Sequence, residues 1–91
     1  MRVIWTNSGL LDLDRLFAFL APKSQSAAAR VIQEITQASL RLSDHPRLGV
    51  RLSEYVGREV RHIIVGDYDL RYEVQDGVIL MLRVWHGREH R

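Results

Sequence analysis

The stretch that decides the fold runs from residue 68 to residue 86 and reads YDLRYEVQDGVILMLRVWH. Apolar and polar residues alternate in its first half, which is typical of a β-strand with one buried face. The pair Asp76-Gly77 follows and is a turn signal for a hairpin. The second half is apolar at almost every position, as expected for a central strand. The stretch therefore predicts two antiparallel strands joined by a tight loop.

Two loop lengths are compatible with this hairpin, and they place different side chains in the core. A two-residue loop, Asp76-Gly77, would pair Glu73 with Leu80 and mix polar with apolar side chains on both faces. A three-residue loop starting at Gln75 makes one face wholly apolar, and a slip of one residue reverses every side chain. We therefore predict the three-residue loop, with Gly77 in a left-handed conformation. Its cross-strand pairs would be Val74 with Val78, Tyr72 with Leu80 and Leu70 with Leu82.

The opposite face of the hairpin would be left partly open to solvent. It would carry Arg71, Ile79, Met81, Arg83 and Trp85.

The rest of the chain predicts two helices and two more strands. Residues 3–5 form a short apolar run that indicates a first strand. Apolar residues recur at three- and four-residue spacing over 10–20 and again over 28–42, which indicates two helices. Alternation over 60–65, ended by Gly66-Asp67, predicts a strand that makes the hairpin a three-stranded meander.

Signals at the helix ends support this division. Asn7 or Ser8 is expected to cap the first helix, with Asp12 and Asp14 in or near its first turn. Pro22 ends that helix, because the residue before a proline avoids the helical region. The short connection predicts an antiparallel helix hairpin. The chain is thus expected to be one α+β domain over residues 1–91, with a four-stranded, mainly antiparallel sheet and both helices on one face.

Composition excludes several classes of protein. The chain has 91 residues and no cysteine, which excludes disulfides, thiolate zinc sites and a cysteine nucleophile. The start of the chain lacks a secretory pattern, and its apolar runs are too short to span a membrane, so a cytoplasmic location is expected. His86 and His90 are four residues apart without a supporting carboxylate or cysteine motif. We expect no metal site and no cofactor.

The charge is local rather than general. The net charge is only +2, and the bases comprise twelve arginines and a single lysine, Lys23. Neither half of the chain is strongly basic, which disfavours a general nucleic-acid-binding surface. Residues 83–91 hold three arginines and two histidines against one acid, Glu89. The end of the last strand is therefore the candidate contact surface.

The order of these segments resembles the RelE/ParE superfamily of toxins from bacterial type II toxin–antitoxin pairs. Asp69 departs from the family pattern, in which an arginine commonly follows the tyrosine at position 68. The ending Leu82 to Arg88 is similar to ParE-like members, whereas RelE-like members often carry a tyrosine near the C-terminus. The residues that carry the resemblance are Pro46, Gly49, Val60-Arg61, Val65-Gly66-Asp67-Tyr68, Tyr68 to Tyr72 and Ile79 to Arg88.

The resemblance implies a toxin that poisons DNA gyrase without catalysing a reaction itself. It also implies a cognate antitoxin partner, which can fold onto the toxin surface in a toxin–antitoxin hetero-oligomer. The alternative within the superfamily is ribosome-dependent cleavage of mRNA, with the ribosome and mRNA as partners. A further alternative, which composition alone allows, is a small basic binding module without toxic activity.

Candidate site residues follow from the open face and the strand end. An RNA-cleaving enzyme needs cations to stabilise the phosphate charge and a base for the 2′-hydroxyl; under that alternative the set would be Arg61, Arg83 and His86. The competing interpretation pairs the strand arginines with nearby carboxylates, and it assigns His45 and His62 a structural or exposed position. The expected target-binding residues are Arg71, Arg83, Trp85, His86 and Arg88.

Overall fold

The computed structural model describes residues 1–89, and its first elements are strand β1 (Arg2–Trp5), helix α1 (Asn7–Leu20) and helix α2 (Gln25–Asp44). The Ser24 hydroxyl caps α2 by accepting a hydrogen bond from the Ala27 N–H at 3.1 Å. For α1 the predicted caps Asn7 and Ser8 are wrong. The cap is Thr6, because β1 places its hydroxyl where it both accepts from Gly9 N–H and donates to the Met81 carbonyl.

The sheet has five strands, in the order β1-β5-β4-β3-β2. The last four are β2 (Val50–Arg51), β3 (Glu59–Val65), β4 (Tyr68–Gln75) and β5 (Val78–His86). β1 pairs parallel with β5, and every other pairing is antiparallel. The strand–helix–helix–meander order is confirmed, and β2 adds a fifth strand whose two residues are too few to show a period in the sequence.

The predicted register of the β4–β5 hairpin is wrong. Gln75 pairs with Val78 across a two-residue Asp76-Gly77 turn, in which Gly77 has a φ of 69°. The unfavourable pair of Glu73 with Leu80 forms after all, because the guanidinium of Arg58 compensates the Glu73 carboxylate. A β-bulge then shifts the pairing by one residue, so that beyond it apolar side chains of both strands again face the core. The observed pairs are Val74 with Ile79, Tyr72 with Met81, Arg71 with Arg83 and Leu70 with Val84.

The corrected register changes which residues face the helices. Ile79 and Met81 were expected on the open face, and instead both are fully buried in the core between the sheet and the helix pair. Leu80 takes their place on the other face, opposite Glu73. The core cluster consists of Leu16, Ile35, Ala38, Leu42, Leu70, Tyr72, Ile79, Met81 and Val84.

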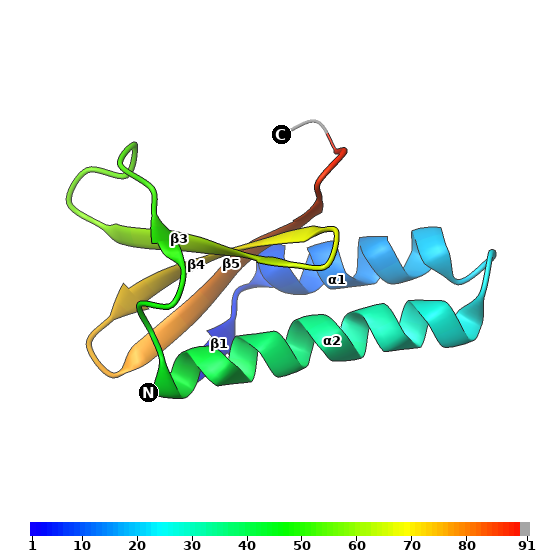
Figure 1. Cartoon of the computed structure of the whole chain (residues 1–91), viewed down its shortest axis with the longest axis horizontal. Helices are drawn as coiled ribbons and strands as arrows, with labels where there is room; N and C mark the ends of the chain where they lie inside the picture. Colours follow the sequence, from blue (N-terminus) through cyan, green and yellow to red (C-terminus); the bar gives the residue numbers. More distant parts are fainter. Residues whose placement is uncertain (90–91) are drawn as a thin grey trace.

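The two helices lie together on one side of the sheet (Figure 1). The predicted apolar stripe of α1 is only partly buried, since Leu10 and Phe17 remain 47% and 41% exposed. Within residues 1–89 no helix covers the opposite face, which we call the open face. Among the same residues, no helix is long and apolar enough to cross a membrane.

Candidate functional site

The open face presents a row of basic side chains that crosses three strands. His62 of β3 pairs with Arg71 of β4, and Arg71 pairs with Arg83 of β5, so the three share one face. In the adjoining row Asp69 of β4 pairs with Trp85 of β5. The Trp85 ring lies against both arginines, with the guanidinium carbons of Arg71 and Arg83 at 4.7 and 4.9 Å from its centroid. The predicted grouping of Arg71, Arg83 and Trp85 on one face is confirmed.

The connector between β2 and β3 packs on this arrangement. The Tyr55 hydroxyl accepts a hydrogen bond from Arg71 Nη1 at 2.9 Å. Arg58 follows three residues later and donates two hydrogen bonds to the Glu73 carboxylate, at 2.7 and 3.1 Å. These bonds hold the pKa of Glu73 below its ordinary value, although its burial opposes the shift. The connector is therefore fixed to the open face at two points.

Helix α1 anchors Arg83 through a buried carboxylate. Asp12 is 4% exposed and accepts hydrogen bonds from Arg83 Nε at 2.7 Å and from the Val84 N–H at 2.8 Å. Burial raises the pKa of Asp12, but the bonds from Arg83, Val84 and Arg15 outweigh burial and hold that pKa below its ordinary value. The Arg83 side chain remains 43% exposed, so a fixed guanidinium is still accessible to a ligand.

Arg61 lies apart from the other candidate residues. It pairs with Tyr72 on the helix-facing side of β3, and its side chain is 17% exposed. Its guanidinium donates to the Gly49 carbonyl at 2.7 Å and to Glu59 at 2.8 Å. Arg61 therefore braces the start of β2 and does not share a face with Arg83.

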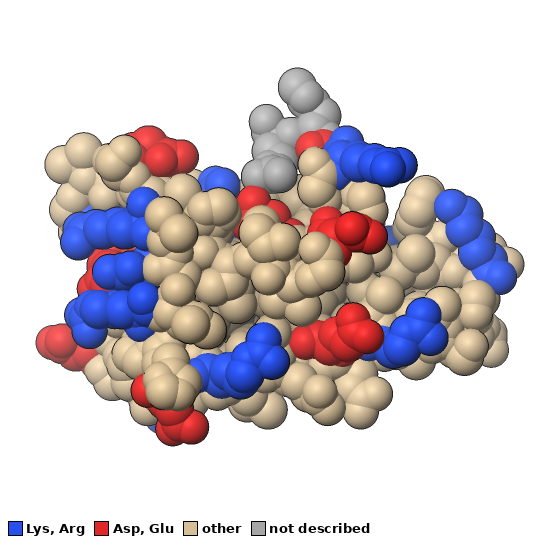
Figure 2. All heavy atoms as spheres, in the orientation of Figure 1, with Lys and Arg blue, Asp and Glu red and all other residues tan. Residues whose placement is uncertain are grey.

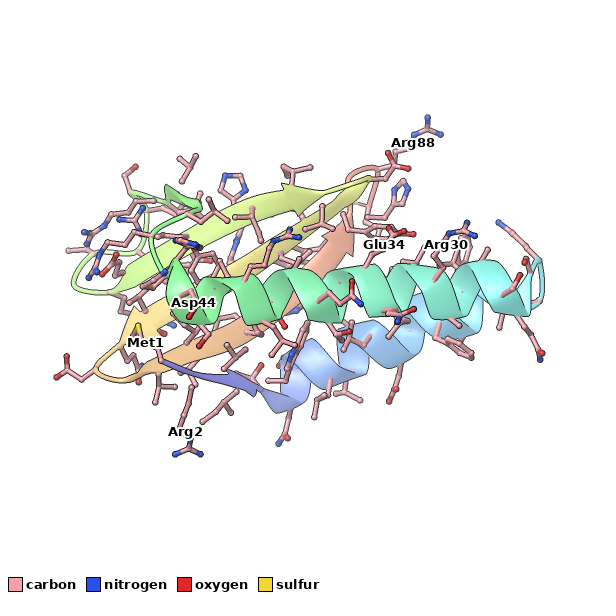
Figure 3. All side chains as sticks on the ribbon, turned by 60° about the horizontal axis from the view of Figure 1, so that its bottom comes forward. Met1, Arg2, Arg30, Glu34, Asp44 and Arg88 are labelled. Carbon is pink, nitrogen blue, oxygen red and sulfur yellow. The ribbon has the colours of Figure 1, made fainter. Side chains whose placement is uncertain are left out.

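His86 and Arg88 lie at the end of β5 beside helix α1, away from the open-face row. The His86 ring stands edge-on to Tyr68, with the ring centroids 5.3 Å apart. The next peptide is held by a 2.7 Å bond from Gly87 N–H to the Asp67 carbonyl, and Arg88 points away from the fold (Figure 3). A cavity of about 730 Å³ opens here, lined in part by Leu16, Phe19, Tyr68, His86 and Arg88. The set Arg61, Arg83 and His86 is thus dispersed over three places.

A salt bridge ties the last described residues to α1. The Glu89 carboxylate accepts bonds from Arg15 and from the His86 N–H. These bonds keep the pKa of Glu89 below its ordinary value against the opposing effect of burial. His90 and Arg91, the end of the predicted basic tail, lie outside the described residues.

Basic side chains also gather at the end of the molecule where β3 begins (Figure 2). The stretch 47–61 supplies four arginines against two glutamates. Arg47 and Arg61 both pair with Glu59, which lies between them. Much of this charge is therefore neutralised locally, whereas Arg71 has no carboxylate partner within residues 1–89. Among those residues there is also no group of three side chains suited to hold a metal ion.

Sequence reasoning missed three residues that contact the candidate site. Asp12 has the signature of a helix-dipole residue and serves instead as the anchor of Arg83. Tyr55 gave no signal, because it lies in an irregular connector. Asp69 did give one, since it departs from the family pattern, and the structure pairs its carboxylate with the ring of His62 at 3.1 Å.

Comparison with known proteins identifies the class. A solved structure titled "Chromosomal ParDE TA system from P. aeruginosa" has the same fold, with a TM-score of 0.77, 22% identity and coverage of 94% of this chain and 95% of that chain. The curated protein "Toxin RelE2" of Caulobacter vibrioides is 32% identical over 86 residues, which are 94% of each chain. The chain is a toxin of the type II toxin–antitoxin class. A family model described as "ParE toxin of type II toxin-antitoxin system, parDE" matches residues 3–91, and the chain belongs to this family.

Proposed function

We propose that this toxin inhibits growth by acting on DNA gyrase and that a cognate antitoxin neutralises it by covering its surface. The observation that carries the proposal is the match of the ParE toxin family over residues 3–91. The dispersal of Arg61, Arg83 and His86 supports the same choice. These three residues were the catalytic set expected for ribosome-dependent mRNA cleavage, and they do not lie together. No reaction by the toxin itself is needed for inhibition of this kind.

We further propose that the target contacts two regions of the toxin. The first is the open face, where Arg71 and Arg83 flank Trp85 and leave positive charge exposed. The second is the end of β5, where Arg88 is exposed. Arginine pairs well with carboxylate and phosphate groups, both of which a complex of gyrase with DNA presents. His86 belongs to the second region through its place beside the cavity.

The direct test uses purified toxin in two assays in parallel. DNA supercoiling by gyrase should be inhibited, and mRNA bound to ribosomes should stay intact. The antitoxin encoded next to the toxin should restore both supercoiling and cell growth. Cleavage of ribosome-bound mRNA with unaffected supercoiling would refute the gyrase proposal, and the absence of growth arrest on expression would favour the plain binding module.

Variants test the two regions. Arg83→Ala and Arg88→Ala should each weaken gyrase inhibition roughly 10- to 100-fold, since a charge-assisted hydrogen bond contributes about 1.5–3 kcal/mol. Arg41→Ala, on the exposed side of α2, is the matched control and should leave inhibition unchanged. Arg15 is unsuitable as a control because it bonds Asp12 and Glu89. Equal losses in all three variants would show that general charge acts and not a site.

A further inference from the structure

The cavity at the end of β5 is large enough for a small organic molecule. Its volume of about 730 Å³ lies within the range of about 300–1,000 Å³ that is usual for ligand sites. Its walls come from the second half of α1 and from the adjoining ends of β4 and β5. The apolar part of the lining consists of Leu16, Phe19, Leu20 and Tyr68, two of which are aromatic. The lining therefore suits a ligand with a flat aromatic body.

The charged residues around the cavity leave one positive charge uncompensated. Arg15 is bound to Glu89, so the charges of this pair cancel. Two more bases line the cavity, and within residues 1–89 neither Lys23 nor Arg88 makes a salt bridge. Against these two cations stands one remaining carboxylate in the lining, that of Asp67. A ligand with a single negative charge would balance the site, whereas a polyphosphate would bring more charge than the lining compensates.

Two neutral side chains in the lining carry hydrogen-bond donors. Nδ1 of His86 accepts a hydrogen bond from the Arg88 N–H at 3.1 Å, so the hydrogen of the neutral ring is on Nε2. Tyr68 stands edge-on to this ring, and burial raises the pKa of its hydroxyl, which therefore keeps its proton. A carboxylate only accepts hydrogen bonds, and it can use N–H and O–H donors alike. It is therefore the acidic group that suits this lining.

The end of α1 does not oppose an anion in this place. The free carbonyl groups of a last helical turn carry partial negative charge, which disfavours an anion. Here the Leu20 carbonyl already accepts the N–H groups of Lys23 and Ser24, both at 3.0 Å. The Lys23 ammonium lies 4.1 Å from the centre of the Phe19 ring. The turn is thus closed on itself, and the side-chain charge that follows it in the chain is positive.

From this arrangement we propose that the cavity is a binding site for a small aromatic monocarboxylate. The aromatic body packs against Phe19 and Tyr68, and the carboxylate pairs with Lys23 and Arg88 at the mouth. The Arg88 side chain is exposed (Figure 3), and its long stem lets the guanidinium turn over a ligand. His86 and Arg88 also belong to the second region proposed above for the target. A bound ligand should therefore relieve gyrase inhibition, a consequence that rests on the proposed function.

The test titrates 2-naphthoate into the full-length toxin and follows the backbone amide signals by NMR. Signals of the residues that line the cavity should shift, with a Kd of roughly 0.1–1 mM for a ligand of about a dozen heavy atoms. 2-Naphthylmethanol has the same ring system without the charge. It should bind to the same residues at least about fivefold more weakly, because an ion pair at a partly exposed site contributes up to this factor.

Variants of the two free cations test the charge argument. Lys23→Ala and Arg88→Ala should each weaken the binding of 2-naphthoate about two- to fivefold, as is usual for a partly exposed ion pair. In the double variant 2-naphthoate and 2-naphthylmethanol should bind equally, since no free cation remains to distinguish them. Arg41→Ala removes the same charge from the exposed side of α2 and is the matched control, with an unchanged Kd. All three side chains are exposed, so the variants should fold.

Three results would overturn the proposed site. These are the absence of binding up to about tenfold above the expected Kd, equal binding of the carboxylate and the alcohol to the wild-type protein, and shifts centred on another surface.

A supercoiling assay gives the second readout, at a 2-naphthoate concentration that leaves gyrase alone unaffected. The ligand should restore supercoiling in the presence of the toxin, and full inhibition by the saturated toxin would overturn the overlap with the target region. A toxin that binds 2-naphthoate and does not inhibit gyrase would refute the proposed function while the binding site stands. The two failures are therefore distinguishable.

Discussion

Asp12 allows a quantitative test of how α1 is joined to the sheet. Its carboxylate is 4% exposed and satisfies the backbone N–H of Val84, which lies beyond the end of the β1–β5 pairing. Replacement by alanine leaves that buried N–H without a partner, at a cost of about 1–3 kcal/mol. The bond to Arg83 adds only about 0.5–1 kcal/mol, because the Arg83 side chain is 43% exposed and solvent screens the pair.

Asp12→Ala should therefore lower the free energy of unfolding by about 1.5–4 kcal/mol. A domain of this size has only about 5–14 kcal/mol in total, and Tm should fall by roughly 10–20 °C. Urea denaturation followed by circular dichroism measures the change. Asp14→Ala is the matched control, since it removes the same charge from an exposed position on the same helix, and it should cost less than about 0.5 kcal/mol.

The pH dependence of Asp12→Asn gives the same reasoning a second test. The folded-state pKa of Asp12 is depressed, so its charge stabilises the fold fully above the unfolded pKa, and this contribution is lost as pH falls through the folded pKa. The stability difference between wild type and Asp12→Asn should be constant near neutral pH and shrink below about pH 4. An Asp12→Ala protein as stable as Asp14→Ala, or a difference from Asp12→Asn that grows toward low pH, would refute the role assigned to this carboxylate.

Two further predictions concern the joint between β2 and β4. Tyr72→Phe should lower the free energy of unfolding, measured by urea denaturation, by about 1–3 kcal/mol. The buried hydroxyl accepts a hydrogen bond from the Gly49 N–H and donates one to the Pro46 carbonyl, both at 2.8 Å. A decrease below about 0.3 kcal/mol would show that water replaces the hydroxyl. Gly49→Ala should lower Tm by at least about 5 °C, since an added Cβ would lie 2.5 Å from the His62 carbonyl oxygen. Gly57→Ala, where nothing lies within 4 Å but φ is 78°, tests backbone strain without a clash, and thermal melts of the two variants together separate these effects.

Much of the fold could be predicted because the elements carry strong local patterns. The helix periods and the turn at Gly66-Asp67 each depend on near neighbours, and the structure confirms both. The hairpin register failed for a non-local reason. Glu73 is buried on the open face, and it is acceptable there only because Arg58, which belongs to another segment, compensates its charge. The β-bulge that shifts the register also cannot be recognised from the alternation of apolar and polar residues in the sequence.

The candidate site was predictable in part for the same reason. Arg71, Arg83 and Trp85 share a face by simple alternation, and the bulge preserves this relation. Arg61 was misplaced because its face depends on the pairing of β3 with β4, which the predicted register did not address. The pairing of His62 with Asp69 joins residues on two strands, so only the paired sheet reveals it.

The parallel pairing of β1 with β5 has a consequence for how the toxin is made. Residues 2–5 find their sheet partners only at residues 78–81. Thr6, Asp12 and Arg15 likewise bond to residues of the last strand or beyond it. Closing so long a loop is slow, and it is impossible while the last strand is still inside the ribosome. The first strand and the two helices therefore remain without their sheet partner until β5 has left the ribosome.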